Sequence, residues 1–204
     1  MASGNDQLVA LVDFGNTLVD ETFLWRDSDA FPDWTHHWSE LMKAIGPSWD
    51  RGSVSTDVVL AEMAARIGRS IQEIESNFDA LCQDIHRYPT INTALAARRA
   101  RGGRQAVVTV NPDCFGKVAE VCQLPSIFDL IITSSEIGND DKVEICSVAC
   151  RRLGIQPSQS VLVDNISTHV ERWRVVGGQG YVFTDDEQFA RDMQLGLVPG
   201  FDAS

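Results

Sequence analysis

The chain has 204 residues, enough for one sizeable hydrophobic core with a small accessory module. Its 17 lysines and arginines against 29 aspartates and glutamates give a net charge of −12, so its surface repels nucleic acid and anionic lipid. Its apolar runs fall far short of the roughly 20 residues that span a bilayer. The polar N-terminus and the five cysteines without Cys-x-x-Cys spacing predict a reduced, cytoplasmic protein that binds neither nucleic acid nor membrane.

The N-terminal part predicts one buried strand followed by a helical insertion. Residues 8–12 are continuously apolar and end in Asp13, as in a parallel strand buried on both faces. Gly15 and Asn16 then mark a sharp loop. Apolar residues next recur at helical spacing over 37–45, 58–67 and 71–85, punctuated by Gly46-Pro47 and Gly68. Residues 20–87 are therefore predicted to be a helical insertion, with residues 1–19 and 88–204 as the core.

The rest of the chain alternates between helix and strand patterns. Strands are predicted over 105–110, 128–133, 160–163 and 180–183, and helices over 91–101, 114–122, 142–153, 170–176 and 186–195. This alternation predicts an α/β fold with a doubly wound, parallel Rossmannoid sheet, whose ligands bind beyond the carboxyl ends of the strands.

Polar residues with useful chemistry follow several of these strands. Asp13 can act as a nucleophile or as a magnesium ligand. The hydroxyl of Thr109 can bind a phosphate oxygen, and the ammonium group of Lys142, at a helix start, can neutralise charge. Asp164-Asn165 offers a metal-binding carboxylate.

The order and placement of these residues resemble the four motifs of the haloacid dehalogenase (HAD) superfamily. Residues 11–18 resemble the first motif, Asp-x-Asp-x-Thr, and residues 107–109 the second. Residues 135–138 followed by Lys142 resemble the third motif, and residues 161–165 followed by 170–177 the fourth. The resemblance implies a HAD-like core with a helical cap inserted after the first motif.

The resemblance also implies a role for each matching residue. Asp13 would be the nucleophile, Thr17 would brace its loop, and Thr109 and Lys142 would hold the transferred group. Asp13, the backbone carbonyl of Gly15 and either Asp164 or Asn165 would bind Mg²⁺. The predicted substrate-binding residues are Gly15, Asn16, Arg26 and Asn111.

The sequence departs from the family pattern at three places. The second aspartate of the first motif, which handles the leaving-group proton, is replaced by Gly15. In the fourth motif Asn165 follows Asp164, and His169 stands near the place of the downstream acid. Lys142 is followed by Val143 instead of the usual proline, which leaves the reach of the lysine open. His36-His37 is a candidate replacement acid or base.

The insertion carries four of the five tryptophans, together with Phe23 and Phe31. These aromatic side chains suit either packing within the insertion or an apolar pocket above Asp13. Three functions remain open: a magnesium-dependent phosphatase or phosphotransferase acting on a small metabolite, a dehalogenase-like enzyme, and a non-catalytic protein that binds a ligand or partner. The expected partner is a small molecule that is phosphorylated or has an apolar part.

Overall fold

A single parallel sheet forms the centre of the molecule. The computed structural model describes residues 8–201. Its five strands lie in the order β3-β2-β1-β4-β5, and every neighbouring pair is parallel. The strands are β1 (Val9–Val12), β2 (Gln105–Thr109), β3 (Leu130–Thr133), β4 (Ser160–Asp164) and β5 (Gln179–Val182). The predicted α/β class and parallel sheet are confirmed.

Side chains from β1 alternate between two apolar layers. Val9 and Leu11 join one buried cluster, whereas Ala10 and Val12 join the other. This alternation explains why β1 is apolar at every position, since both of its faces are covered. Val12 pairs with Val107 of β2 and Val163 of β4, so the residues after these three strands meet at one edge.

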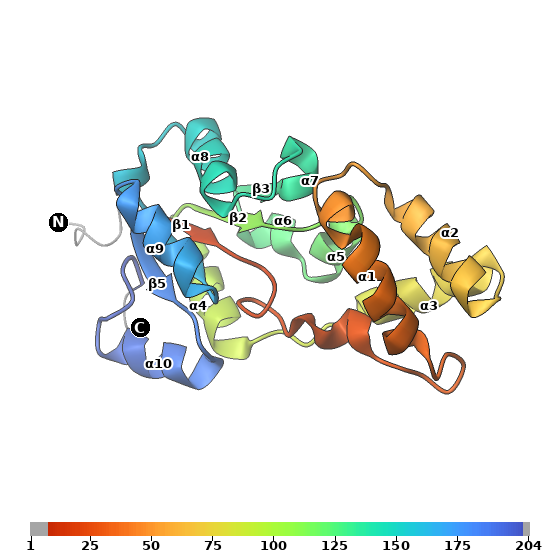
Figure 1. Ribbon diagram of the computed structural model, residues 1–204. Helices are drawn as coiled ribbons and strands as arrows, with labels where there is room; N and C mark the ends of the chain where they lie inside the picture. Colours follow the sequence, from red (N-terminus) through yellow and green to blue (C-terminus); the bar gives the residue numbers. More distant parts are fainter. Residues whose placement is uncertain (1–7, 202–204) are drawn as a thin grey trace.

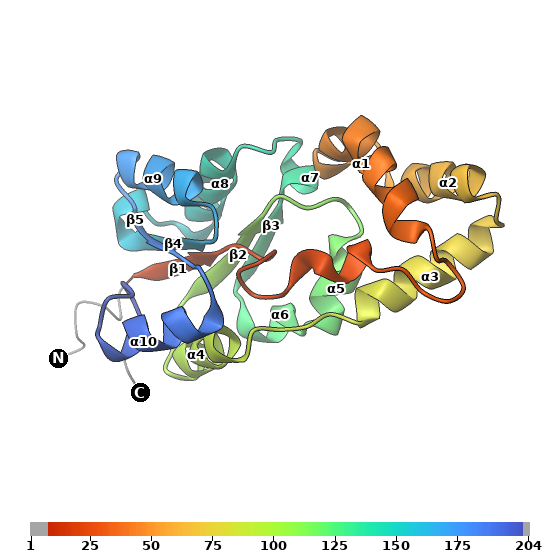
Figure 2. The same ribbon diagram turned by 60° about the horizontal axis from the view of Figure 1, so that its bottom comes forward.

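Helices cover both faces of the sheet (Figure 2). One face carries α8 (Lys142–Leu153) and α9 (Ser167–Val175). The other face carries α4 (Pro89–Ala100), α5 (Phe115–Val121), α6 (Leu124–Ile127) and α10 (Asp186–Gln194). Short helices α7 (Ser134–Ile137) and η2 (Pro157–Gln159) complete the connections.

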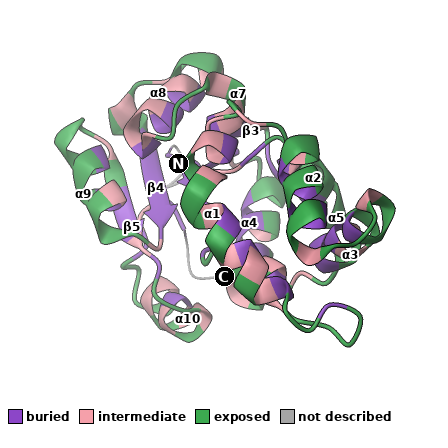
Figure 3. Cartoon of the chain, turned by 45° about the vertical axis from the view of Figure 1, so that its right-hand side comes forward, coloured by how far each residue is buried: buried purple, intermediate pink, exposed green. Residues whose placement is uncertain are grey.

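The segment between β1 and α4 is helical and lies to one side of the sheet (Figure 1). It contains η1 (Glu21–Trp25), α1 (Trp34–Asp50), α2 (Thr56–Ile67) and α3 (Ile71–Gln83). Each helix buries a stripe against its neighbours and exposes the rest (Figure 3). We call residues 20–87 the insertion; its treatment as a separate domain stays a prediction.

Helix α1 corrects one expectation, because it continues through Gly46-Pro47 instead of ending there. A residue before proline normally avoids the helical region because its Cβ meets the proline ring. Gly46 has no Cβ and escapes that clash. The last turn is held by buried Trp49, whose ring lies 5.6 Å from that of Trp38 and 6.5 Å from that of Phe78.

The chain enters and leaves the insertion through two paired segments, residues 18–20 and 86–88, which we call the neck. The amide of Asp20 donates to the carbonyl of His86 at 2.8 Å, and that of Tyr88 donates to Leu18 at 3.0 Å. An isolated antiparallel bridge joins Val19 to Arg87 between these two bonds. Within residues 8–201, no helix is both long and apolar enough to cross a membrane.

Candidate active site

Asp13 and Lys142, 129 residues apart in sequence, form a buried ion pair at the carboxyl end of the sheet. Asp13 directly follows β1, and its amide donates to the carbonyl of Val163 at 2.9 Å. The Nζ atom of Lys142, the first residue of α8, lies 2.7 Å from Oδ1 of Asp13 and donates to the carbonyl of Val108 at 3.0 Å. Lys142 therefore reaches the predicted nucleophile without the usual proline after it.

A second carboxylate shares the same ammonium group. Oδ2 of Asp164 lies 3.2 Å from Lys142 Nζ, and Asp164 is fully buried. Burial would lower the pKa of Lys142, but Asp13 and Asp164 outweigh it and raise that pKa. Burial raises the pKa of Asp13, with Asp164 adding to the rise and Lys142 opposing it. The site thus combines two carboxylates with one firmly protonated ammonium group.

His169 also contacts Asp164. Its Nδ1 atom lies 3.1 Å from Oδ2 and 3.2 Å from Oδ1 of that carboxylate, and the amide of Ile166 donates to Oδ1 at 2.8 Å. Burial would raise the pKa of Asp164, but the hydrogen bond from His169 and the charge of Lys142 lower it. Asp164 is therefore held ionised by His169 and Lys142, which both line a polar cavity.

Thr17 and Asn111 fix the surrounding loops. The buried hydroxyl of Thr17 accepts a hydrogen bond from the amide of Asn165 at 3.2 Å. This bond joins the loop after β1 to the loop after β4. The side-chain amide of Asn111 donates to the hydroxyl of Thr109 at 2.7 Å. The first contact connects loops that lie far apart in sequence, whereas the second braces the loop after β2 internally.

These residues surround a polar cavity of about 160 Å³. Most of the predicted site residues line it. The three that do not are Arg26 and the buried residues Asp164 and Thr17. The lining comprises Asp13, Gly15, Asn16, Glu21, Thr109, Val110, Asn111, Lys142, Asn165, Ile166 and His169. Of the two candidates in the fourth motif, Asn165 therefore lines the cavity with Asp13, while Asp164 lies behind it.

Glu21 is a cavity residue that sequence reasoning missed. A Cβ atom built on Gly15 would lie 2.5 Å from the carboxyl carbon of Glu21, so the carboxyl fills the space that a side chain at position 15 would need. Asn16 donates to Oε2 of Glu21 at 3.3 Å and accepts from its amide at 3.4 Å. The sequence signal was only an acidic residue shortly after the first motif.

The environment of Glu21 favours its protonated form. The residue Glu21 as a whole is exposed, and it lines the cavity. Its carboxyl group, however, is closely surrounded by protein atoms. The loss of water there raises its pKa to about 7, and the nearby carboxylates of Asp13 and Asp50 add to the rise.

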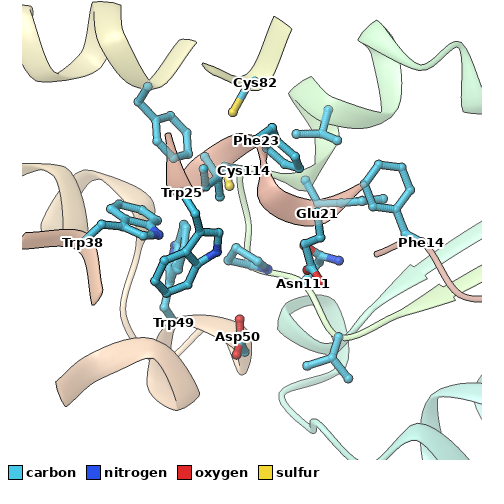
Figure 4. A pocket seen from close by; sticks show the side chains of 16 residues that line it. Phe14, Glu21, Phe23, Trp25, Trp38, Trp49, Asp50, Cys82, Asn111 and Cys114 are labelled. Atoms are coloured by element: carbon cyan, nitrogen blue, oxygen red, sulfur yellow. The ribbon is translucent and has the colours of Figure 1, made fainter. Parts of the chain in front are cut away.

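A second cavity, also of about 160 Å³, adjoins the first. The two share Glu21, Val110 and Asn111, and Figure 4 shows Glu21 extending toward Asn111. We call the second the aromatic cavity, because rings dominate its lining: Phe14, Phe23, Trp25, Trp38, Trp49, Phe78 and Phe115. Asp50, one of its polar side chains, has a pKa raised to about 6 by burial and by Asp140. The aromatic side chains therefore serve both alternatives left open by the sequence: several line this cavity, whereas Trp34 and Phe31 pack within the insertion and do not line it.

The structure does not bring Arg26 or the histidine pair to either cavity. Arg26 forms an ion pair of 2.6 Å with Asp84 at the surface, because the chain has turned outward after η1. His36 and His37, near the start of α1, face each other with ring centroids 5.3 Å apart. Neither histidine is among the residues lining the two cavities.

The oxygen donors of the polar cavity suit a magnesium ion in kind but are few. Asp13 supplies a carboxylate and Asn165 a neutral amide oxygen, whereas Mg²⁺ favours anionic oxygen ligands. Among residues 8–201, no cluster of three or more His, Cys, Asp or Glu side chains is arranged to hold a metal. The residues therefore fit a weakly held Mg²⁺ that keeps several of its waters.

No protein-family model and no curated protein matches the chain, but solved structures do. A HAD-family enzyme from Bacteroides thetaiotaomicron matches with a TM-score of 0.66 and 14% identity, over 90% of this chain and 97% of that one. The L-2-haloacid dehalogenase from Xanthobacter autotrophicus matches with a TM-score of 0.64 and 15% identity, over 94% and 85%. A HAD phosphatase from Thermococcus onnurineus matches with a TM-score of 0.60 and 17% identity, over 87% and 86%.

Proposed function

From the HAD-like fold that this chain adopts, we propose that it is a hydrolase that uses Asp13 to cleave small phosphate esters. The observation that carries the proposal is the pairing of Asp13 with buried Lys142, 2.7 Å apart, beside a polar cavity at the carboxyl end of the sheet. A carboxylate held there can attack an electrophile that enters the cavity. The adjacent ammonium group offsets the negative charge that builds up as the reaction proceeds.

The mechanism follows from the positions of the side chains. An Asp13 oxygen attacks phosphorus, and the bond from phosphorus to the alcohol oxygen breaks, which leaves a phosphoryl group on Asp13. Thr109 and Asn111 lie at the cavity wall and can donate hydrogen bonds to the phosphoryl oxygens. Water then attacks phosphorus, and Asp13 leaves as a carboxylate. Asp13 and Asp164 raise the pKa of Lys142 before attack, and Asp164 remains beside its ammonium group while Asp13 carries the phosphoryl group.

Magnesium is part of the proposal. Asp13 and Asn165 would hold the ion, with Asp164 behind them and the carbonyl of Gly15 as a further donor. When bound, Mg²⁺ supplies positive charge next to the phosphoryl oxygens. The HAD-family enzyme from Bacteroides thetaiotaomicron has been crystallised with magnesium and inorganic phosphate, which supports the same ion here.

The aromatic cavity indicates the rest of the substrate. It adjoins the polar cavity at Glu21, and its wall is formed mainly by rings from the insertion and from α5. An alcohol with an apolar or aromatic group would bury that group there, while its phosphate reaches Asp13. We therefore propose a phosphate monoester of an apolar alcohol as the substrate class.

A second candidate is dehalogenation at carbon. Of the two fourth-motif residues, the neutral Asn165 and not the carboxylate of Asp164 lines the cavity with Asp13, and an L-2-haloacid dehalogenase is among the similar structures. Asp13 would then attack carbon and displace halide. That reaction requires no magnesium.

One assay separates these functions from a non-catalytic role. The protein and its Asp13→Asn variant are incubated with aromatic phosphate esters and with 2-haloacids, each with and without Mg²⁺. Phosphate release that needs Mg²⁺ and is lost in the variant supports the phosphatase. Halide release without Mg²⁺ supports the dehalogenase. The absence of both, with no beryllofluoride adduct on Asp13, contradicts both enzymes and leaves ligand binding.

A further inference from the structure

Ester cleavage through Asp13 needs a group that donates a proton to the leaving alcohol. The loop after β1 has no acidic side chain that could donate it. An alkoxide is a poor leaving group unless it is protonated as it departs, and such proton transfer is typically worth about 10²–10⁴-fold in rate. Position 15, two residues beyond Asp13, is a glycine. Lys142 is committed to Asp13 and Asp164. His169 lines the polar cavity, but its Nδ1 atom is paired with Asp164 and it does not line the aromatic cavity that would hold the leaving alcohol.

We infer that the carboxyl group of Glu21 is the general acid and base of this site, delivered from the insertion into the space that Gly15 leaves open. The inference rests on the proposed phosphatase function. Two observations carry it. The Glu21 carboxyl lies where a side chain at position 15 would be, 2.5 Å from a Cβ built there. Glu21 also lines the polar cavity with Asp13 and the aromatic cavity that would hold the leaving alcohol.

Protons and bonds balance through both half-reactions. As the phosphorus–oxygen bond to the alcohol breaks, protonated Glu21 gives its proton to the alcohol oxygen. Glu21, now a carboxylate, takes a proton from the water that attacks the phosphoryl group on Asp13. Inorganic phosphate leaves, Asp13 regains its carboxylate, and Glu21 is protonated again.

Asn16 is the positioning residue for Glu21. It adopts a left-handed conformation with φ of 52°, and its side chain makes both hydrogen bonds to Glu21 described above. These bonds fix the start of η1 against the loop after β1. The acid therefore belongs to the insertion but is held by the core.

The first test uses three esters of similar size whose alcohols are progressively weaker acids: p-nitrophenyl, phenyl and benzyl phosphate. For Glu21→Gln we expect kcat/KM on benzyl phosphate to fall by roughly 100- to 10,000-fold, because benzyl alkoxide must be protonated to leave. The value for p-nitrophenyl phosphate should fall by less than about 10-fold, since p-nitrophenolate leaves unaided. The phosphorylated form of Asp13 should accumulate, detected by intact-protein mass spectrometry after an acid quench, because its hydrolysis lacks a base.

The second test restores a carboxylate from the other side of the cavity. Gly15 is not among the glycines with positive φ, so an aspartate can adopt its backbone conformation once Glu21 is shortened. The double variant Gly15→Asp/Glu21→Ala should cleave benzyl phosphate at least about 10-fold faster than Glu21→Ala alone. Gly15→Asp by itself should lose activity, because its side chain meets the Glu21 carboxyl.

The outcomes distinguish this inference from the proposed function. Glu75→Gln, at an exposed glutamate of α3, is the matched control and should leave all three rates unchanged. An equal loss on all three esters without phosphoenzyme accumulation, or no loss at all, would overturn the role of Glu21 while Asp13→Asn still abolishes activity. If the unaltered protein releases no phosphate with Mg²⁺, the proposed function and the inference both fail.

Discussion

Lys142 has a structural role besides the chemical one proposed for it, because its ammonium group is the partner of two buried carboxylates. Removing one member of a buried ionic group leaves the others without compensation, which typically costs about 3–5 kcal/mol. Lys142→Met should therefore lower the free energy of unfolding by about that amount near neutral pH, measured by urea denaturation. Lys43→Met removes an exposed lysine paired with Glu40 and should cost less than about 1 kcal/mol. Equal losses in the two variants would contradict this account.

Glu21 gives a pH dependence of stability whose sign follows from its raised pKa. The folded protein keeps a proton on Glu21 up to about pH 7, whereas the unfolded chain releases it near its ordinary pKa. The contribution of Glu21 to the free energy of unfolding therefore falls as pH rises from its ordinary pKa to about 7, and it stays constant at higher pH. Glu21→Gln should raise Tm more at about pH 8 than at about pH 5, measured by calorimetry. Glu40 is the control, because the hydrogen bond from Lys43 lowers its pKa. Glu40→Gln should therefore give no increase in Tm at the higher pH.

The placement of a residue at the candidate site was predictable from the sequence where the residue lies at the end of a strand. Asp13 and Thr109 follow or end neighbouring strands, and the carboxyl ends of parallel strands meet at one edge. Glu21 was not predictable, because its approach depends on the left-handed turn at Asn16 and the direction of η1. For the same reason Arg26, five residues further on, was wrongly expected at the site.

At the scale of elements, the end of α1 forms one of the contacts between the insertion and the core, beside those of Thr56 with Asp113 and of Asp79 with Lys117. The hydroxyl of Ser134 in α7 donates to the carbonyl of Asp50, and Arg51 pairs with Asp140 at 2.8 Å. Gly52 follows with φ of 69°, and a Cβ there would lie 2.8 Å from the carbonyl oxygen of Ser135. Close approach of these two backbones therefore requires glycine at position 52.

Two glycine substitutions isolate the effect of this contact. Gly52→Ala and Gly68→Ala both place alanine at a positive φ, at a cost of roughly 1–2 kcal/mol. Nothing lies within 4 Å of a Cβ on Gly68, so that variant carries the backbone cost alone. Gly52→Ala should lose at least about 1 kcal/mol more in urea denaturation and should raise KM, because α1 is pushed away from α7. Equal losses would mean that the contact is not tight in solution.

Most elements were predictable from periodicity and punctuation. The helix α8 was predicted with its observed bounds; in the structure Asp141 caps its start and Gly154 ends it in a left-handed conformation. The extension of α1 beyond Gly46-Pro47 was missed, since tertiary packing of Trp49 outweighs the local signal. The four-residue helices α6 and α7 are too short to leave a periodic pattern.

For the whole molecule, the charge of −12 opposes the approach of an anionic ester. Raising ionic strength from about 10 mM to about 150 mM screens that long-range repulsion but barely affects the buried Lys142. We expect kcat/KM for benzyl phosphate to rise roughly two- to five-fold over this range, measured at constant Mg²⁺. A fall would mean that local positive charge at the cavity mouth governs encounter.

The neck has a further consequence for how such a protein can be altered. Because residues 18–20 and 86–88 are hydrogen-bonded to each other, excising the segment between them leaves two chain ends already side by side. A short turn would join them. The entropic cost of closing this short turn is smaller than the cost of closing the long segment that it replaces. The paired ends also mean that a segment of another length or composition could be grafted there without disturbing the strand register. Substrate choice could then change while Asp13 and Lys142 stay in place, provided that the graft again supplies an acid at the position of Glu21.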